Sequence, residues 1–155
     1  LAHPINRLLI SPQGYQRSHL SKTPKANRLG TRNTTETNLT KSCRNYHPKH
    51  RKISALKEHL SEYSITVFMG TWCSDTHELL PMFFKVLQEA GYPMSKMTMY
   101  GVERSKETPG DNVKKYSITN LPTIIVLDKE GNEVGRITET VNKSVEGDMV
   151  KIVGR

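Results

Sequence analysis

The stretch Trp72-Cys73-Ser74-Asp75-Thr76 carries the strongest indication of fold in this sequence, because it places a cysteine between an apolar run and a helical pattern. Upstream, residues 65–69 form a short β-rich run that ends at Gly70-Thr71. Downstream, apolar residues recur at helical spacing until Gly91, a natural helix stop. We therefore predict that Cys73 lies at a helix N-terminus, where unpaired backbone N–H groups and the helix dipole favour thiolate over thiol.

A second stretch, Leu121-Pro122-Thr123, precedes the apolar run 124–127, and the chain then turns at 129–132 into another strand-like segment. Pro81 stands eight residues after Cys73. Together and in this order, these features resemble the thioredoxin-like proteins. Their active site is a strand, a Trp-Cys-x-x-Cys turn and a proline-kinked helix, and a cis-proline faces the active cysteine. The resemblance covers about residues 53–153.

The resemblance implies an α/β thioredoxin-like fold, with a central mixed β-sheet flanked by helices on both faces. It also implies a cis bond at Leu121–Pro122, which leaves the backbone of Leu121 available to an extended substrate, with Trp72 as the opposite wall. We expect helices over 52–62, 73–90, 111–117 and 144–153, strands over 64–69, 97–102, 123–128 and 133–138, and a polar loop over 105–112. Ser144 is the expected N-cap of the last helix.

Two positions depart from the family pattern. The second cysteine of the motif is replaced by Thr76, so the motif reads Cys-x-x-Thr, and the family's buried acid is replaced by Val67. The two losses are chemically consistent, because without a resolving thiol a buried carboxylate has no proton transfer to assist. Because the motif has only one thiol, it cannot form a disulfide within itself, and dithiol–disulfide cycling there is excluded.

These residues favour a monothiol thioredoxin-like protein in which Cys73 attacks a disulfide and forms a mixed disulfide that an external thiol resolves. The expected catalytic residues are Cys73 and Thr76, and the expected substrate-binding residues are Trp72, Leu121 and Pro122. The Thr76 hydroxyl either donates to the Cys73 sulfur or is merely a helix-surface group. The alternatives are a non-catalytic peptide-binding module, a redox sensor oxidised at Cys73, and an inert buried cysteine.

Two neighbours of the motif have simpler interpretations. Asp75 suits the first turn of a helix, where the dipole favours acids, and we interpret it as structural. His77 is either a proton shuttle or, as we expect, a solvated first-turn residue.

The excess of basic over acidic residues lies entirely in the front segment of the chain, residues 1–60. Residues 1–60 carry twelve Lys or Arg and two Glu, whereas residues 61–155 carry eleven basic and thirteen acidic groups. Residues 1–45 lack apolar periodicity and are expected to form a basic, poorly ordered arm, and residues 46–155 the thioredoxin-like domain. The alternative for the arm is that residues 5–10 add a strand or dock on the core. The basic front segment, residues 1–60, has only two aromatic residues, Tyr15 and Tyr46, and no recognition motif, so we do not predict nucleic-acid binding.

Cys43, His47 and His50 have metal-ligand side chains, but a fourth ligand and a zinc spacing are missing, so we predict no metal and no cofactor. Cys43 is otherwise incidental or resolves a disulfide on Cys73. The expected partner is a peptide or small molecule that contains a disulfide or thiol. We recognise no signal peptide and no run of membrane-spanning length. The substrate, the oligomeric state and the compartment, cytoplasmic or periplasmic, stay open.

Overall fold

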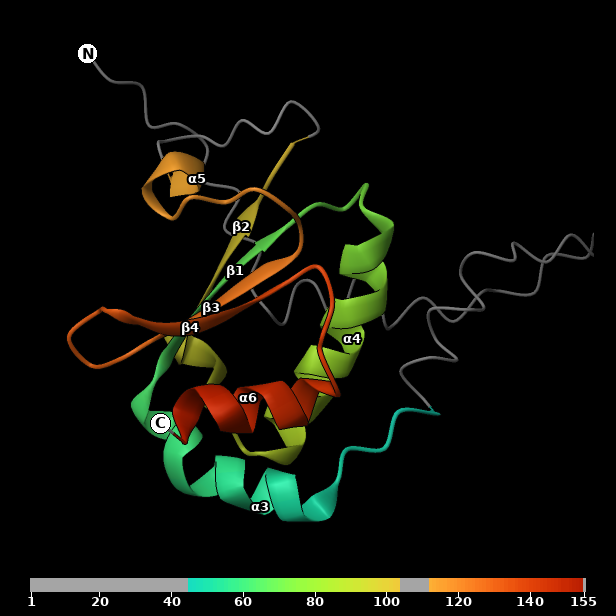
Figure 1. Ribbon diagram of the computed structural model, residues 1–155, viewed down its shortest axis with the longest axis vertical. Helices are drawn as coiled ribbons and strands as arrows, with labels where there is room; N and C mark the ends of the chain where they lie inside the picture. Colours follow the sequence, from blue (N-terminus) through green and yellow to red (C-terminus); the bar gives the residue numbers. More distant parts are fainter. Residues whose placement is uncertain (1–44, 104–111, 155) are drawn as a thin grey trace, which may run out of the picture.

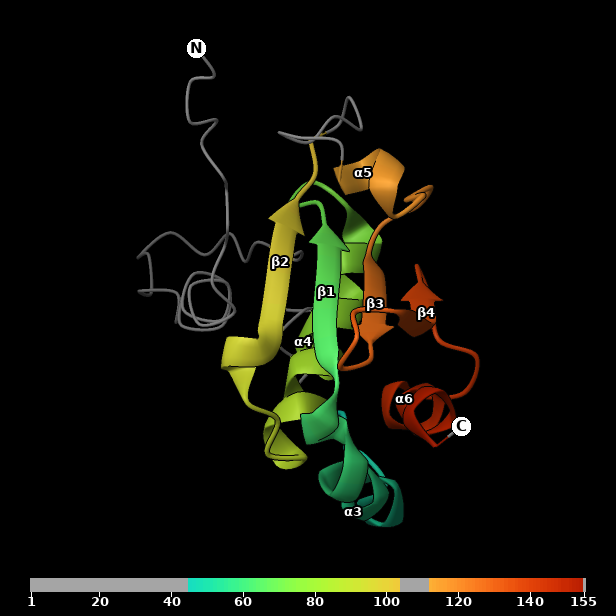
Figure 2. The same cartoon turned by 90° about the vertical axis from the view of Figure 1, so that its left-hand side faces the viewer.

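A computed structural model of the protein describes residues 45–103 and 112–154. Its four strands are β1 (Ser64–Met69), β2 (Met97–Gly101), β3 (Thr123–Leu127) and β4 (Glu133–Thr138). They form one mixed sheet in the order β2-β1-β3-β4 (Figure 2), with β1 parallel to β2 and antiparallel to β3, and β3 antiparallel to β4. The expectations for residues 5–10, Cys43 and most of the 105–112 loop lie outside the described residues.

The helices follow the predicted order along the chain (Figure 1). They are α3 (His50–His59), α4 (Ser74–Glu89), α5 (Asn112–Lys115) and α6 (Val145–Val153), with 3₁₀ turns at Leu60–Glu62 and Met94–Lys96. Among the described elements, the Met94–Lys96 turn is the one that the sequence did not predict. The other boundaries agree to within about two residues, which is the usual uncertainty at element ends.

Alternation along β1 divides the core into two layers. Ile65, Val67 and Met69 are buried on the face that α3, α4 and α6 cover, and Figure 2 shows α4 running behind the sheet. Phe68 points to the opposite face, where Tyr116 at the end of α5 packs against it. Helices therefore flank both faces, and α5 is the only helix on the second face among the described elements. The predicted α/β thioredoxin-like fold is confirmed.

The last helix begins as its sequence predicted. Ser144 is the N-cap of α6, and its Oγ accepts a hydrogen bond from the Gly147 N–H at 3.2 Å. Val145, Met149 and Val153 of this helix are buried, but Ile152 is only partly buried. Ile152 instead lies against Gly135 of β4, where an added Cβ would come within 2.9 Å of its side chain. Gly135 thus lets α6 pack closely on the edge of the sheet.

A hydrogen-bonded cluster joins the first described residues to the start of α6. The Tyr46 hydroxyl donates to the Glu146 carboxylate and accepts from the Val145 N–H at 3.2 Å. The Lys49 N–H donates to the second carboxylate oxygen at 3.3 Å. Burial acts to raise the pKa of Glu146, but these hydrogen bonds outweigh it and hold the pKa below its ordinary value. Burial, followed by the bond to Glu146, raises the pKa of Tyr46.

Candidate functional site

Cys73 is the N-cap residue of α4, with an extended backbone (φ −91°, ψ 124°). The turn that leads from β1 into the helix is closed by the Cys73 N–H, which donates to the Gly70 carbonyl at 3.0 Å. The Cys73 side chain does not cap the helix and is partly exposed. The predicted location of this thiol at a helix N-terminus is therefore confirmed, and its sulfur is free for other contacts.

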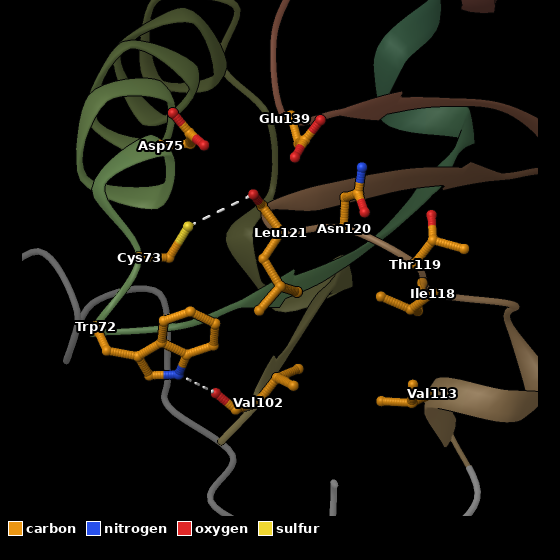
Figure 3. A pocket seen from close by; sticks show the side chains of 10 residues that line it. All are labelled: Trp72, Cys73, Asp75, Val102, Val113, Ile118, Thr119, Asn120, Leu121 and Glu139. Carbon is orange, nitrogen blue, oxygen red and sulfur yellow. Dashed lines mark hydrogen bonds between the residues drawn. The ribbon is translucent and has the colours of Figure 1, made fainter. Parts of the chain in front are cut away.

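The segment before β3 brings the predicted proline to this sulfur. The Leu121–Pro122 peptide bond is cis, as predicted. The Cys73 thiol donates to the Leu121 carbonyl oxygen, with the two atoms 3.6 Å apart (Figure 3). A thiolate has no proton to donate, so ionisation of Cys73 would leave this carbonyl available to another donor.

Trp72 forms one wall of the site. The side chain is 39% exposed, and its Nε1–H donates to the Val102 carbonyl at 2.9 Å (Figure 3). Gly70 allows this position, because a Cβ there would lie 2.9 Å from the indole Cε2 and 3.3 Å from the Leu121 Cδ1. The indole is thus held at the end of β2, an arrangement that no local pattern around Trp72 indicated.

A pocket of about 190 Å³ lies between these groups. Its lining consists of Trp72, Cys73, Asp75, Val102, Val113, Ile118, Thr119, Asn120, Leu121 and Glu139. Sequence reasoning identified three of these ten as site residues: Trp72, Cys73 and Leu121. Asp75 belongs to the motif itself, where we interpreted it as structural. The remaining six come from four separate segments, and the only available signal was that Thr119 and Asn120 precede the predicted cis-proline.

Thr76 lies behind the cysteine and not in the pocket. It is fully buried, so the interpretation as a helix-surface residue is wrong. Its Oγ1 accepts a hydrogen bond from the Gly70 N–H at 3.3 Å. The structure thus gives the Thr76 hydroxyl oxygen a backbone donor in the turn that positions Cys73, a contact that neither of the two sequence-based alternatives included.

Two further residues near the motif are Val67, which is apolar and buried on β1, and His77, which contacts the turn before α4. Val67 is fully buried on β1, in register with Met99 on β2 and Ile124 on β3. His77 is partly buried, and its Nε2 lies 2.6 Å from the Thr71 carbonyl oxygen. Because a carbonyl only accepts, Nε2 carries the proton, and the expectation of a merely solvated His77 is wrong.

Within residues 45–103 and 112–154 there is no group of three or more His, Cys, Asp or Glu side chains that could hold a metal ion. In the same part of the chain, no helix has the length and apolar character needed to cross a membrane. Cys43 lies outside these ranges, so the structure does not address its relation to His47, His50 or Cys73.

The mixed sheet, the helix that follows β1 and the cis-proline segment facing a cysteine define a protein of the thioredoxin-like fold. A protein of unknown function from Pseudomonas aeruginosa matches with a TM-score of 0.58 and 15% identity, over 81% of this chain and 87% of that one. An HIV epitope scaffold matches with a TM-score of 0.56 and 15% identity, over 80% and 87%. A thioredoxin pre-protein from Schistosoma mansoni has a TM-score of 0.42 and 24% identity, over 68% and 91%. These similarities concern the fold alone.

No protein-family model and no curated protein matches the sequence.

Proposed function

We propose that this protein is a monothiol thioredoxin-like protein that exchanges disulfides through Cys73. The observation that carries the proposal is the position of the sulfur, which lies partly exposed in a pocket at the start of α4, 3.6 Å from the Leu121 carbonyl. Helix N-termini favour the anionic thiolate, which is the reactive form. Among the described residues Cys73 is the only cysteine, so the Cys-x-x-Thr motif acts with one thiol.

The proposed reaction has two exchange steps. Cys73 first loses its proton to water, and the thiolate attacks one sulfur of a substrate disulfide. A bond forms from Sγ to that sulfur, the substrate disulfide breaks, and the leaving thiolate takes a proton from water. A low-molecular-weight thiol then attacks the mixed disulfide as its thiolate, forms a new disulfide with the substrate half, and releases Cys73. The external thiol thus supplies the electrons that reduce the first-released half of the substrate, while the other half leaves as a mixed disulfide with that thiol.

Leu121 and Thr76 have supporting roles in this proposal. Once Cys73 is ionised or bonded to substrate, the Leu121 carbonyl is able to accept from a backbone N–H of an extended peptide beside the sulfur. Thr76 holds the Gly70 N–H and so keeps the turn that presents Cys73 in shape. Trp72 forms a wall of the pocket that the substrate enters, and Pro122, which is not among the lining residues, contributes the cis bond that follows Leu121.

The test uses Cys43→Ser protein, so that a single thiol remains. We expect bis(2-hydroxyethyl) disulfide to give one hydroxyethylthio adduct by intact-mass spectrometry, formed faster than with N-acetylcysteine amide as reference thiol. Excess 2-mercaptoethanol should restore the original mass. The matched Cys43→Ser/Cys73→Ser variant should give no adduct. A rate no faster than that of the reference thiol would contradict the proposal.

A second candidate is a non-catalytic module that binds extended peptides. It is favoured by the Trp72 indole and the Leu121 carbonyl, which bound the pocket with groups other than the sulfur. In that case Cys73→Ser leaves peptide affinity unchanged, and the adduct rate does not exceed that of the reference thiol. Loss of peptide binding in the Cys73→Ser variant supports disulfide exchange instead.

A further inference from the structure

The pocket beside Cys73 has two carboxylates and no cation among its described lining residues. Asp75 comes from the first turn of α4, and Glu139 follows the end of β4. Figure 3 shows both side chains at the same end of the pocket, on either side of the space beyond the Leu121 carbonyl. The other described lining residues are apolar or carry uncharged polar groups, so the fixed charge of the described lining is negative.

Glu139 is held at this position by its backbone. Its φ of +59° lies in the left-handed region, which is uncommon for residues other than glycine, asparagine and aspartate. Its N–H donates to the Pro122 carbonyl at 2.9 Å, so the residue is tied to the segment that faces Cys73. This bond fixes the backbone of Glu139 beside the segment that faces Cys73, and Glu139 is among the residues that line the pocket.

The two carboxylates are not neutralised by the part of the chain that the structure describes. The ion pairs found there are His59–Glu58, Lys129–Glu62 and Arg136–Glu133. Both Asp75 and Glu139 are partly buried, which reduces the screening of their charge by solvent and salt. A cationic group that enters the pocket gains from this field, and an anionic group is opposed by it.

We propose that the Cys73 pocket selects disulfides and thiols that carry a positive charge close to the reacting sulfur, such as a peptide cysteine flanked by Lys or Arg, and rejects anionic ones. This inference rests on the proposed exchange function and names its substrate class. The exchange step is unchanged: Sγ bonds to one sulfur of the cationic disulfide, that disulfide breaks, and the cationic thiolate leaves and takes a proton from water. The electrons that later reduce the mixed disulfide come from an added thiol.

The overall charge of the chain makes this a sharp test. The formal net charge is +8, so a non-specific field would favour an anionic reagent. A preference for cations would run against this net charge, and the variants below test whether it comes from the pocket.

Cys43→Ser protein is reacted with cystamine, bis(2-hydroxyethyl) disulfide and bis(2-sulfonatoethyl) disulfide, which are cationic, neutral and anionic. The measured quantity is the ratio of the cystamine rate to the sulfonate rate, divided by the same ratio for N-acetylcysteine amide. This quotient cancels effects on the sulfur that all reagents share. We expect about tenfold or more at low salt, and a smaller value in 0.5 M salt because of screening.

Variants identify the source of the preference. Asp75→Asn and Glu139→Gln should each lower the quotient several-fold, and the double variant should bring it close to one. Glu130→Gln removes one negative charge from an exposed residue outside the pocket lining and should leave the quotient unchanged. Two peptide disulfides, with Lys or with Glu next to the cysteine, distinguish a peptide substrate from a small aminothiol. A Lys-to-Glu rate ratio larger than the cystamine-to-sulfonate rate ratio identifies a peptide substrate. A smaller one identifies a small aminothiol.

A quotient near one, or one that Asp75→Asn and Glu139→Gln do not alter, overturns the inference of a charge preference. If the neutral disulfide still forms its adduct faster than with the reference thiol, the exchange function stands. Failure of all three disulfides to react faster than with the reference thiol overturns the exchange function itself.

Discussion

The Sγ atom of Cys73 lies 3.6 Å from the carbonyl oxygen of Leu121, although 48 residues separate them in the chain. This contact joins the start of α4 to the segment that leads into β3, which pairs with β1 in the middle of the sheet. Among the described residues, the sulfur therefore faces a main-chain carbonyl and no second thiol.

Replacement of Thr76 by cysteine should convert the site to a dithiol. Residues three apart on a helix have Cβ atoms about 5–6 Å apart, within reach of a disulfide after small adjustments. In a Cys43→Ser background, Thr76→Cys protein treated with diamide should lose both thiols to alkylation and regain them with dithiothreitol. Two thiols that still alkylate after oxidation would show that the buried side of α4 prevents the bond.

The Thr76 hydroxyl should protect the Gly70 amide, in the turn before Cys73, from hydrogen exchange. Thr76→Val keeps the shape of the side chain but leaves the Gly70 N–H without its acceptor, at a cost of about 1–3 kcal/mol in the free energy of unfolding. Hydrogen exchange at the Gly70 amide, followed by NMR, should accelerate. Thr76→Ser retains the oxygen and should keep this amide protected, despite losing about 0.8 kcal/mol with the methyl group. Equal exchange in both variants would exclude the role.

Gly70 should be required for the position of Trp72. In Gly70→Ala the new Cβ would lie 2.9 Å from the indole Cε2, so the ring must move away from the Val102 carbonyl. Trp72 is the only tryptophan in the chain, so its fluorescence reports this displacement directly. We expect a shifted emission maximum and greater quenching by acrylamide. Thr71→Ala, at the exposed next residue, is the matched control and should leave the spectrum unchanged.

Glu146 should make the domain sensitive to acid. Its folded-state pKa lies below the ordinary 4.5, so the stability it contributes is complete above that value and is lost as the pH falls through the folded pKa. Glu146→Gln should therefore cost about 1–2 kcal/mol at pH 7 and progressively less below pH 4.5, as urea titrations at several pH values would show. Parallel curves for the two proteins across this range would contradict the assignment. Exposed Glu130→Gln is the control.

We propose that residues 1–45 form an arm that adds little to the core of the domain that begins at Tyr46. Removal of residues 1–45 should leave the thermal midpoint almost unchanged. Removal of one further residue deletes the Tyr46 hydroxyl that bonds Glu146 and the Val145 N–H, and should lower the stability by about 1–3 kcal/mol. A large loss already on removal of residues 1–45 would favour docking of residues 5–10 on the domain.

The sequence by itself determined the order of elements and the end of β1 at which Cys73 lies. Strand and helix follow from local periodicity, because side chains two apart share a strand face and those three or four apart share a helix face. Ser144 at the start of α6 was predictable for the same reason, since an N-cap bonds within its own turn. The resemblance carried by two short motifs then indicated which proline faces the cysteine.

Only the tertiary structure decided which groups surround the sulfur. The bond from Trp72 to Val102, the burial of Thr76 on the Gly70 amide and the entry of Glu139 into the pocket each depend on how distant segments are packed. Glu139 is the clearest case, because its sequence environment is that of an ordinary residue after a strand. Glu139 reaches the site because β4 pairs with β3 and because the Glu139 backbone N–H donates a hydrogen bond to the Pro122 carbonyl. Such contacts join positions far apart in the chain, and no local pattern of side chains encodes them.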